Sequence, residues 1–488
     1  MFRDESSKVI QKAHAQWGSS SSPTDASESS ASNSSPTWAD DSSGSISDSP
    51  SLASPLSSRN VAPARIPNKI GLNVEQQGMQ FYINRYLMNH PDSPRTRDEV
   101  AAYFSDADAA QNVMIAVGLA GMSNLLGNKN MNLLARSKYV TALKQTGQLI
   151  ASNNPAGLIA RLRSVVSLAL FEVVQGRGPR VTVGSANTHI NGAVAVLRSV
   201  LPLPQAPNKG AHGVLQLLFS MFIPYQMTDT PLSPGFFETL KFCKQLLDGL
   251  PESCSVDLAL AIARLIQLLA IADHTVLTDE HYITNDLIRQ FLTLDDVFDN
   301  LETPLSRAFP FAEHQGEYPA AAVFRKKYHT YGDTWGSRIW NHYRWARILA
   351  NQRLVQFVTE YPISSKQNIP TARKTRCYTT IERLAEDILT SAPSHWHHPM
   401  LDPESTRNFE ARGMGNSGAV GLPSLLWHLM VAGCAPNVPL EFWSWAHNAL
   451  QVIWKQMGMQ HALALSEMME EHRTKLNKEA SMQVGIQA

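Results

Sequence analysis

The amino-acid sequence predicts an all-α protein, and three observations lead to this fold class. Apolar residues recur at helical spacing along most of the chain after residue 71. No segment of strand length alternates clearly between apolar and polar residues, and no sequence repeat of fixed period is present. The chain has 488 residues, which is long enough to bury a large core. We therefore expect one large helical domain over residues 71–475, followed by a flexible tail over residues 476–488.

Residues 1–70 are expected to form an arm outside the helical domain. Phe2–Ala13 is compatible with a short helix, and the stretch Gly18–Ser58 that follows is dominated by serine, with Pro, Asp and Gly. A segment with so few apolar residues cannot bury enough surface to offset the entropy lost when it becomes ordered. We predict that this Ser-rich arm is disordered.

The stretch Tyr139–Arg198 shows the helical pattern most clearly. One apolar stripe covers Tyr139–Ile150, and an Asn-Asn-Pro sequence then breaks the helix. The next helix, about Ala156–Val174, is apolar on nearly all sides and is expected to be buried. The glycines and the proline of residues 176–180 end it. A third helix, rich in small residues, is predicted over His189–Arg198.

Further helices are predicted by the same periodicity on both sides of this stretch. The most apolar is Val256–Ala272, which has Asp257 in its first turn. This helix contains charged residues and the run Val113–Leu126 is short, so neither is expected to cross a membrane. The remaining predicted helices include Asp106–Leu126, Val214–Ile223 and Phe236–Leu247.

Composition and charge exclude several functional classes. Lys+Arg and Asp+Glu both number 42, so the chain lacks the positive net charge of a typical nucleic-acid-binding protein. The four cysteines are scattered, which favours free thiols in a reducing compartment over a disulfide framework. The N-terminal residues lack the apolar core of a secretory signal. We therefore expect a soluble intracellular protein. The cysteines are Cys243, Cys254, Cys377 and Cys434.

Three short motifs follow one another in the stretch Tyr139–Arg198. They are Tyr139 with Ala142-Leu143, Phe171-Glu172, and His189 with Gly192-Ala193 and Leu197. Their order and spacing resemble the middle region of fungal transcription factors of the zinc binuclear cluster class. That region has a Tyr-x-x-Ala-Leu helix, a buried helix that ends near Phe-Glu, and a His-x-x-Gly-Ala-x-x-x-Leu segment.

The resemblance continues through the C-terminal half of the chain. Trp340–Leu349 is similar to the Asn-x-Tyr-Arg-x-x-Arg-Ile-Leu helix of the family, and Glu382–Pro393 is similar to its Asp-Ile-x-x-Ser-x-Pro segment. Leu425–Gly433 is similar to a Leu-x-Trp-x-Leu-x-x-Ala-Gly helix, and the amphipathic helices over Leu450–Met468 are similar to the closing pair. The similarity covers about Ala110–Glu470.

The DNA-binding part of this family has no counterpart in the sequence. In the family, a cluster of cysteine thiolates holds two zinc ions, whereas the first cysteine of this chain is Cys243. One explanation is that the chain begins just after a zinc cluster, because Phe2–Ala13 resembles the segment that follows the cluster in some members. The other is that the protein is a regulator that works through partners and has no cluster of its own.

The resemblance implies a regulator of transcription that acts in the nucleus and controls a metabolic or secondary-metabolite gene set. The expected partners are the transcription machinery or other regulators, and a homodimer is compatible with the sequence. DNA would be bound only if a zinc cluster is supplied upstream or by a partner, and no membrane is involved. The resemblance assigns no catalytic, cofactor-binding or metal-binding residue in this chain, so we expect that the protein is not an enzyme.

A chemical alternative rests on Asp295, Asp296 and Asp299. Class I terpene cyclases and prenyltransferases use an Asp-Asp-x-x-Asp motif to hold magnesium against a diphosphate, because that ion prefers oxygen ligands. The alternative function is therefore a magnesium-dependent terpene cyclase or prenyltransferase. Against it, the sequence has no second Asn-x-x-x-Ser-x-x-x-Glu site and no basic pair evidently placed for a diphosphate. The structural interpretation is that apolar residues of this helix face the core while the acids stay in water.

Five other patterns also have simple structural interpretations. His395–His398 lies between two prolines and is expected to be a surface loop rather than a zinc or copper site. Gly413–Gly418 fits Gly-x-Gly-x-x-Gly, but no strand precedes it, so a flexible loop is expected. Arg373–Arg376 and Arg325–Lys327 are candidates for nuclear import, although solvated helix faces are favoured. His189 is expected to be a core or interface histidine.

Overall fold

The computed structural model of the protein describes residues 73–87, 108–152, 158–176, 178–199, 207–228, 231–402, 405, 409 and 421–487. The chain divides into the units Met1–Gly71 and Leu72–Ala488, and every described residue belongs to the second. The predicted Ser-rich arm and the loop Gly413–Gly418 lie outside the described residues. The described part is built almost entirely of helices, which confirms the predicted all-α fold class.

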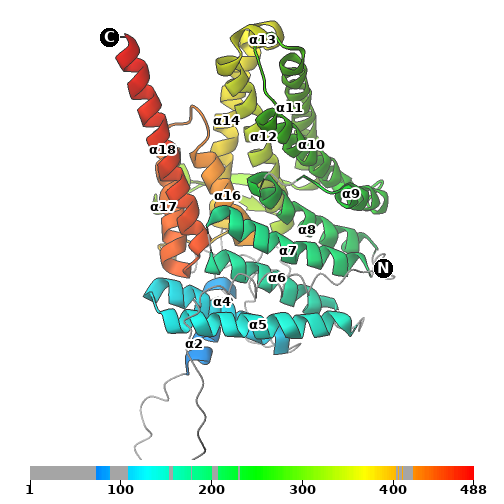
Figure 1. Ribbon diagram of the computed structural model, residues 1–488, viewed down its shortest axis with the longest axis vertical. Coiled ribbons are helices and arrows are strands. Elements are labelled where there is room, and N and C mark those ends of the chain that lie inside the picture. Colours follow the sequence, from blue (N-terminus) through cyan, green and yellow to red (C-terminus); the bar gives the residue numbers. More distant parts are fainter. Residues whose placement is uncertain are drawn as a thin grey trace, which may run out of the picture. The chain divides into compact units, whose positions relative to one another are not determined.

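The helices are labelled in chain order in Figure 1. They are α2 (Val74–Tyr82), α4 (Asp108–Leu126), α5 (Lys129–Ala151), α6 (Leu158–Gln175), α7 (Pro179–Arg198), α8 (Pro207–Thr228), α9 (Pro234–Leu246), α10 (Cys254–His274), α11 (Tyr282–Ala308), α12 (Thr334–Glu360), α13 (Pro362–Asn368), α14 (Thr371–Ser391), α16 (Gly421–Gly433), α17 (Leu440–Met457) and α18 (Gln460–Gln487). Four single turns are η1 (Ile83–Leu87), η3 (Pro251–Ser253), η4 (Phe324–Lys326) and η5 (Ala392–Ser394).

The three helices predicted in Tyr139–Arg198 are present as the C-terminal part of α5, α6 and α7. Gly176 ends α6 in the left-handed conformation (φ 52°), which glycine adopts readily. Pro179 then begins α7 well before the predicted start, because a proline is favourable at the first helical position. Helices α6, α7 and α8 lie side by side, and each packs on the next (Figure 1).

Helices α2 and α4 approach each other closely at a pair of glycines. A Cβ atom on Gly118 would lie 1.8 Å from the carbonyl oxygen of Gly78. Real side chains are never so close to a carbonyl oxygen, so the two backbones meet only because neither residue has a side chain. The neighbouring side chains of Tyr82 and Leu119 are fully buried, which places this crossing in the core.

Helix α10 is a core helix of the fold. Together with η3 it is the one helix in the described ranges that is long and apolar enough to cross a membrane, but 67% of its apolar 18-residue window is buried inside the protein. Its Asp257 pairs with Lys244 of α9, with 2.6 Å between Nζ and Oδ1. Since helical neighbours cover most of its apolar surface, α10 has the environment of a core helix rather than that of a membrane span.

A β-hairpin is the one departure from helices among the described residues. Strand β1 (Phe311–Gln315) pairs antiparallel with β2 (Lys327–Tyr331), and Phe311 lies opposite Tyr331. The expectation that no strand is present was wrong here, because β1 is exposed along most of its length and shows no alternation. The hairpin is held by aromatic packing instead: the ring of Phe311 lies 5.0 Å from that of Trp340 on α12.

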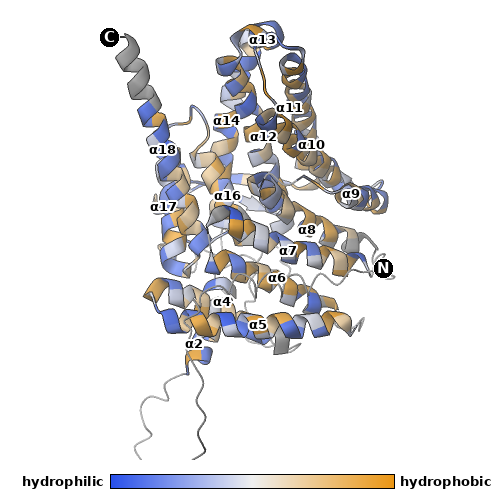
Figure 2. Cartoon of the chain, in the orientation of Figure 1, coloured by the Kyte–Doolittle hydropathy of each residue, from blue (hydrophilic) through white to orange (hydrophobic). Residues whose placement is uncertain are grey.

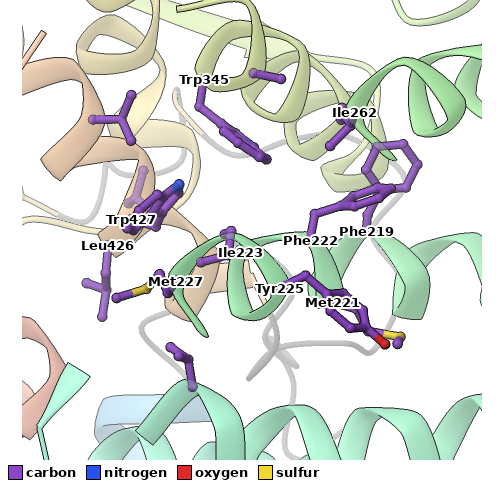
Figure 3. Packing of buried hydrophobic residues seen from close by; sticks show 14 of the residues in the cluster. Phe219, Met221, Phe222, Ile223, Tyr225, Met227, Ile262, Trp345, Leu426 and Trp427 are labelled. Atoms are coloured by element: carbon purple, nitrogen blue, oxygen red, sulfur yellow. The ribbon is translucent and has the colours of Figure 1, made fainter. Parts of the chain in front are cut away.

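The C-terminal helices α16, α17 and α18 pack on one another in succession. Hydrophobic residues predominate along α8 and α16 (Figure 2). Figure 3 shows Met227 of α8 directed toward Leu426 of α16, whereas Phe222 of the same helix is directed toward Ile262 of α10. Helix α8 therefore joins α16 to α10 within one core. Helix α18 continues to Gln487, so the residues predicted as a flexible tail are helical up to that position.

Candidate functional site

Helix α12 carries polar side chains through the centre of the fold. Every residue from Thr334 to Ile348 on this helix is buried. A polar or charged group that is removed from water on all sides needs hydrogen-bond partners inside the protein. Many of the partners come from α11 and α14, and others from α8 and from strand β2. The sequence motif Trp340–Leu349 therefore lies almost entirely in the buried stretch of α12 and contributes polar side chains to it.

The acidic motif of α11 faces this helix. Asp295, Asp299 and Glu302 lie at spacings of four and three residues, which brings them to one side of α11. Asp295 is only 1% exposed, whereas Asp296 is 58% and Asp299 42% exposed. The expectation that these acids stay in water was therefore wrong for Asp295. Its carboxylate is buried because cations of α12 and α14 compensate its charge.

Arg347 of α12 is the principal cation and binds three carboxylates. Its Nε lies 3.0 Å from Oδ1 of Asp295, its Nη2 2.5 Å from Oδ1 of Asp299, and its Nη1 3.1 Å from Oε2 of Glu302. The guanidinium group is 1% exposed and has fixed planar geometry, which suits several carboxylates at once. Asn351, one turn further along α12, also donates to Oδ1 of Asp295 at 2.7 Å.

Helix α14 supplies the other cations of this network. Arg373 Nη2 lies 2.8 Å from a carboxylate oxygen of Asp295 and 2.8 Å from one of Asp296. Arg376 pairs with Asp299 at 2.6 Å. The basic cluster Arg373–Arg376 was expected to be a solvated helix face, and for Arg373 that is wrong, because its side chain is largely buried against α11.

We call these acids and arginines the α11–α12–α14 ion-pair network. Its members are Asp295, Asp296, Asp299 and Glu302 of α11, Arg347 of α12, and Arg373, Arg376 and Arg383 of α14; Arg383 pairs with Glu302 at 2.7 Å. Sequence reasoning missed these arginines as partners, because they follow the acids by 45 to 81 residues and no local pattern connects the two groups.

The arginines keep the carboxylates ionised. Burial alone would raise the pKa of Asp299, but the hydrogen bonds and charges of Arg376 and Arg347 lower it overall. Burial would likewise raise the pKa of Glu302, and Arg383 together with the Tyr343 hydroxyl lowers it. Both carboxylates are therefore charged at neutral pH, and each negative charge is matched by a guanidinium.

This geometry explains the Asp-Asp-x-x-Asp motif without a metal ion. All three aspartates already accept hydrogen bonds from arginines, so magnesium would have to displace these donors to reach the oxygens. Among the described residues, no group of three or more His, Cys, Asp or Glu is arranged to hold a metal ion. The arrangement favours a structural role for Asp295, Asp296 and Asp299, in which they join α11 to α12 and α14.

A second polar group surrounds the N-terminal half of α12. Asn341 donates to Oγ of Ser391 at 2.9 Å and contacts Nε2 of His395 at 3.0 Å. Arg344 donates to the Tyr331 hydroxyl at 2.8 Å and to Oδ1 of Asn341 at 3.0 Å. These bonds connect α12 to the end of α14 and to the hairpin, and they give partners to Nη1 of an arginine that has no access to solvent.

The histidine-rich segment His395–His398 is not a surface loop. His395, Trp396, His397 and His398 are all buried, between 2% and 9% exposed. The prediction failed because the flanking prolines indicate a turn but do not indicate what covers it. Burial lowers the pKa of His398 to about 4, so this ring is neutral at physiological pH.

A third polar group joins residues of the three short motifs in Tyr139–Arg198. The Tyr139 hydroxyl donates to Oε1 of Glu172 at 2.6 Å and lies 2.9 Å from Nε2 of His189. The Tyr139 ring stacks on Phe171, with 4.2 Å between centroids. His189 is thus a hydrogen-bonded histidine between α5, α6 and α7, as expected from the sequence.

The other two predictions concern surface charges and thiols. The cluster Arg325–Lys327 was expected to be a solvated helix face, but it lies on the single turn η4 and at the start of β2. Arg325 and Lys327 both pair with Glu386, at 2.7 and 3.4 Å. All four cysteines are free, which confirms that prediction. Burial raises the pKa of each thiol to about 11 or 12, so the thiols are protonated at neutral pH.

Comparisons with known proteins give no relative. No family model, no curated protein and no solved structure matches the chain. The resemblance to the fungal transcription factors therefore rests on the motifs of the sequence.

Proposed function

We propose that the helical unit is the regulatory domain of a transcription factor of the fungal zinc binuclear cluster class. The observation that carries this proposal is the group formed by Tyr139, Glu172 and His189. These residues belong to three separate motifs of the resemblance, 33 and 50 positions apart from Tyr139, and they share one set of hydrogen bonds. Motifs that were recognised by order and spacing alone thus have a common structural role.

The family motif Trp340–Leu349 supports the same proposal. In Trp340–Leu349, the Trp340 indole donates to the carbonyl oxygen of Phe309 at 2.7 Å, and Asn341, Arg344 and Arg347 hold the two polar groups around α12. Each of these side chains is engaged in joining helices, and none is left as a catalytic acid, base or nucleophile. Such a domain acts through the surfaces that its helices present to other proteins.

In this proposal the protein works in the nucleus through contacts with the transcription machinery or other regulators. A metabolic or secondary-metabolite gene set is the expected target, as in the family that the motifs resemble. DNA contact requires a zinc cluster, which would be supplied upstream of this chain or by a partner. A homodimer is compatible with this mode of action.

A tethered reporter assay tests the proposal. The full chain is fused to a heterologous DNA-binding domain in a fungal strain that carries the matching reporter gene. We expect reporter expression to rise or fall relative to the DNA-binding domain alone. Glu172→Gln, which weakens the Tyr139 group, should reduce the effect, and Glu471→Gln on the exposed surface of α18 should not.

Two results would count against this function. One is an unchanged reporter at a protein level equal to that of the DNA-binding domain alone. The other is exclusion of a fluorescent fusion of the full chain from the nucleus.

A further inference from the structure

A pocket lies among α6, α7, α8, α16 and α18, away from the ion-pair network. Its volume is about 80 Å³, several times the roughly 10–15 Å³ that a single water molecule requires. Most of the lining is apolar and includes Val166, Ala186, Ile190 and Ile223. Part of its empty space is continuous with solvent, so a small molecule has a way in.

His461 of α18 is the notable polar group in this lining. The residue is 3% exposed, and burial lowers the pKa of its ring to about 4, so the imidazole is neutral at pH 7. Its Nδ1 has no hydrogen-bond partner, and none of the described residues forms a hydrogen bond with its other nitrogen. A neutral imidazole has one donor and one acceptor, and leaving both unused inside a protein is unfavourable.

Asn187 of α7 lines the same pocket and has a buried Oδ1 without a partner. Burial raises the pKa of Tyr225 overall, although side-chain hydrogen bonds from Asn191 and Asn187 act to lower it. A hydrogen bond that stabilises the phenolate comes from the amide nitrogen of Asn187, so the amide oxygen remains as a free acceptor. The pocket therefore combines an apolar wall with two polar side chains that have unused hydrogen-bonding capacity.

We propose that this pocket binds a small, neutral, mainly apolar molecule that carries one hydroxyl group, and that His461 forms a hydrogen bond with that hydroxyl. The apolar lining disfavours a charged ligand, because no counter-charge is present among the lining residues. A hydroxyl both donates and accepts, so it can pair with either nitrogen of a neutral imidazole. This inference goes beyond the proposed function and does not depend on it, since binding is measured on the purified chain.

The test uses two probes of the same shape, 4-fluorophenol and 4-fluorotoluene, in fluorine NMR titrations of the full chain. We expect saturable binding of both, with the dissociation constant of 4-fluorophenol lower by about threefold to tenfold, the size of one net hydrogen bond. His461→Phe keeps an aromatic ring but removes the nitrogens, and should make the two dissociation constants equal. The matched control is His447→Phe on α17, outside the pocket lining, which should leave their ratio unchanged.

A second pair of variants tests the location. Ala186→Phe should fill the pocket and abolish saturable binding of both probes, whereas Ala151→Phe at the exposed end of α5 should not. Circular dichroism checks that each variant is folded, and Val166→Phe replaces Ala186→Phe if the latter does not fold. The proposal is overturned by absence of saturable binding to the wild type, by equal affinity for the two probes, or by binding that survives the filled pocket.

Discussion

Arg347 shows how a single residue determines what the acidic motif does. A buried carboxylate such as Asp295 is stable in a protein only when its charge is compensated. Arg347 compensates it and at the same time reaches Asp299 and Glu302, so one guanidinium connects three acids of α11. A lysine has one compact charge and cannot match this planar geometry. The chemistry of the motif is thus decided by a residue that lies outside it.

Arg347→Ala is expected to lower the free energy of unfolding by about 3–5 kcal/mol, because it leaves buried carboxylate charge without its main partner. The measurement is urea denaturation followed by circular dichroism. Arg376→Ala is the matched control: its side chain is 43% exposed, so losing its pair with Asp299 should cost at most about 1 kcal/mol. An equal loss of unfolding free energy in the two variants would show that the burial of Arg347 adds nothing to the stability of the protein.

Buried histidines should make the protein sensitive to mild acid. Burial lowers the pKa of His398 and His461 to about 4, below the value of about 6.5 expected in the unfolded chain. Between these two values the unfolded state binds more protons, so stability rises with pH and falls on acidification. Each such histidine changes the free energy of unfolding by about 1.4 kcal/mol per pH unit in this window.

We therefore expect the thermal midpoint to fall between pH 7 and pH 5. Asp299 and Glu302 add a loss at lower pH. Their pKa values are lowered in the folded state, so their contribution to stability is complete above the pKa of the unfolded state and is lost as the pH falls from there toward the folded-state pKa. The loss between pH 7 and 5 should be smaller in His461→Phe than in the wild type. A midpoint that is constant between pH 7 and pH 5 would contradict the neutral state of these histidines.

At the scale of elements, the sequence predicts what depends on local periodicity. The helices around Tyr139–Arg198 and α10 were found because an apolar face repeats along each of them. The hairpin β1–β2 was missed because β1 has no such repeat and is held by aromatic contacts with α12. The burial of His395–His398 and the arginine partners of Asp295 were missed for the same reason, since both depend on distant segments.

The crossing of α2 and α4 is a contact between elements that two glycines make possible. Gly118→Ala would place a Cβ atom 1.8 Å from the carbonyl oxygen of Gly78, so α2 should be pushed off α4 and the thermal midpoint should fall. Gly147→Ala on α5 is the matched control, because no atom lies within 4 Å of the new Cβ. This control should be stabilised by about 0.5–1 kcal/mol, as alanine is favoured over glycine inside a helix.

Limited proteolysis locates the effect. Cleavage in α2 of Gly118→Ala should be faster than in the wild type, and cleavage elsewhere should be unchanged. If the thermal midpoint rises in both Gly118→Ala and Gly147→Ala, then α2 and α4 can move apart without a loss of stability.

Across the helical unit, one hydrophobic core extends from Tyr82 to Met469. Two polar groups lie around α12 beside this core, and each consists of side chains that bind one another. A class I cyclase site needs the opposite arrangement, with carboxylates that are free to bind magnesium at the mouth of a cavity. Because the acids are bound to arginines, this arrangement argues against a magnesium-dependent cyclase function for the protein.

The purified chain should release no diphosphate from farnesyl or geranyl diphosphate in the presence of magnesium. Arg347, Arg373 and Arg376 already occupy the oxygens of the acidic motif, and displacing Arg347 and Arg373 would leave two largely buried guanidinium groups without their partners. The assay measures inorganic diphosphate, with an authentic class I cyclase as positive control. Magnesium-dependent release that is lost in Asp295→Ala but retained in Asp257→Ala, whose carboxylate pairs with Lys244 on α9, would overturn the proposed regulatory function in favour of an enzymatic one.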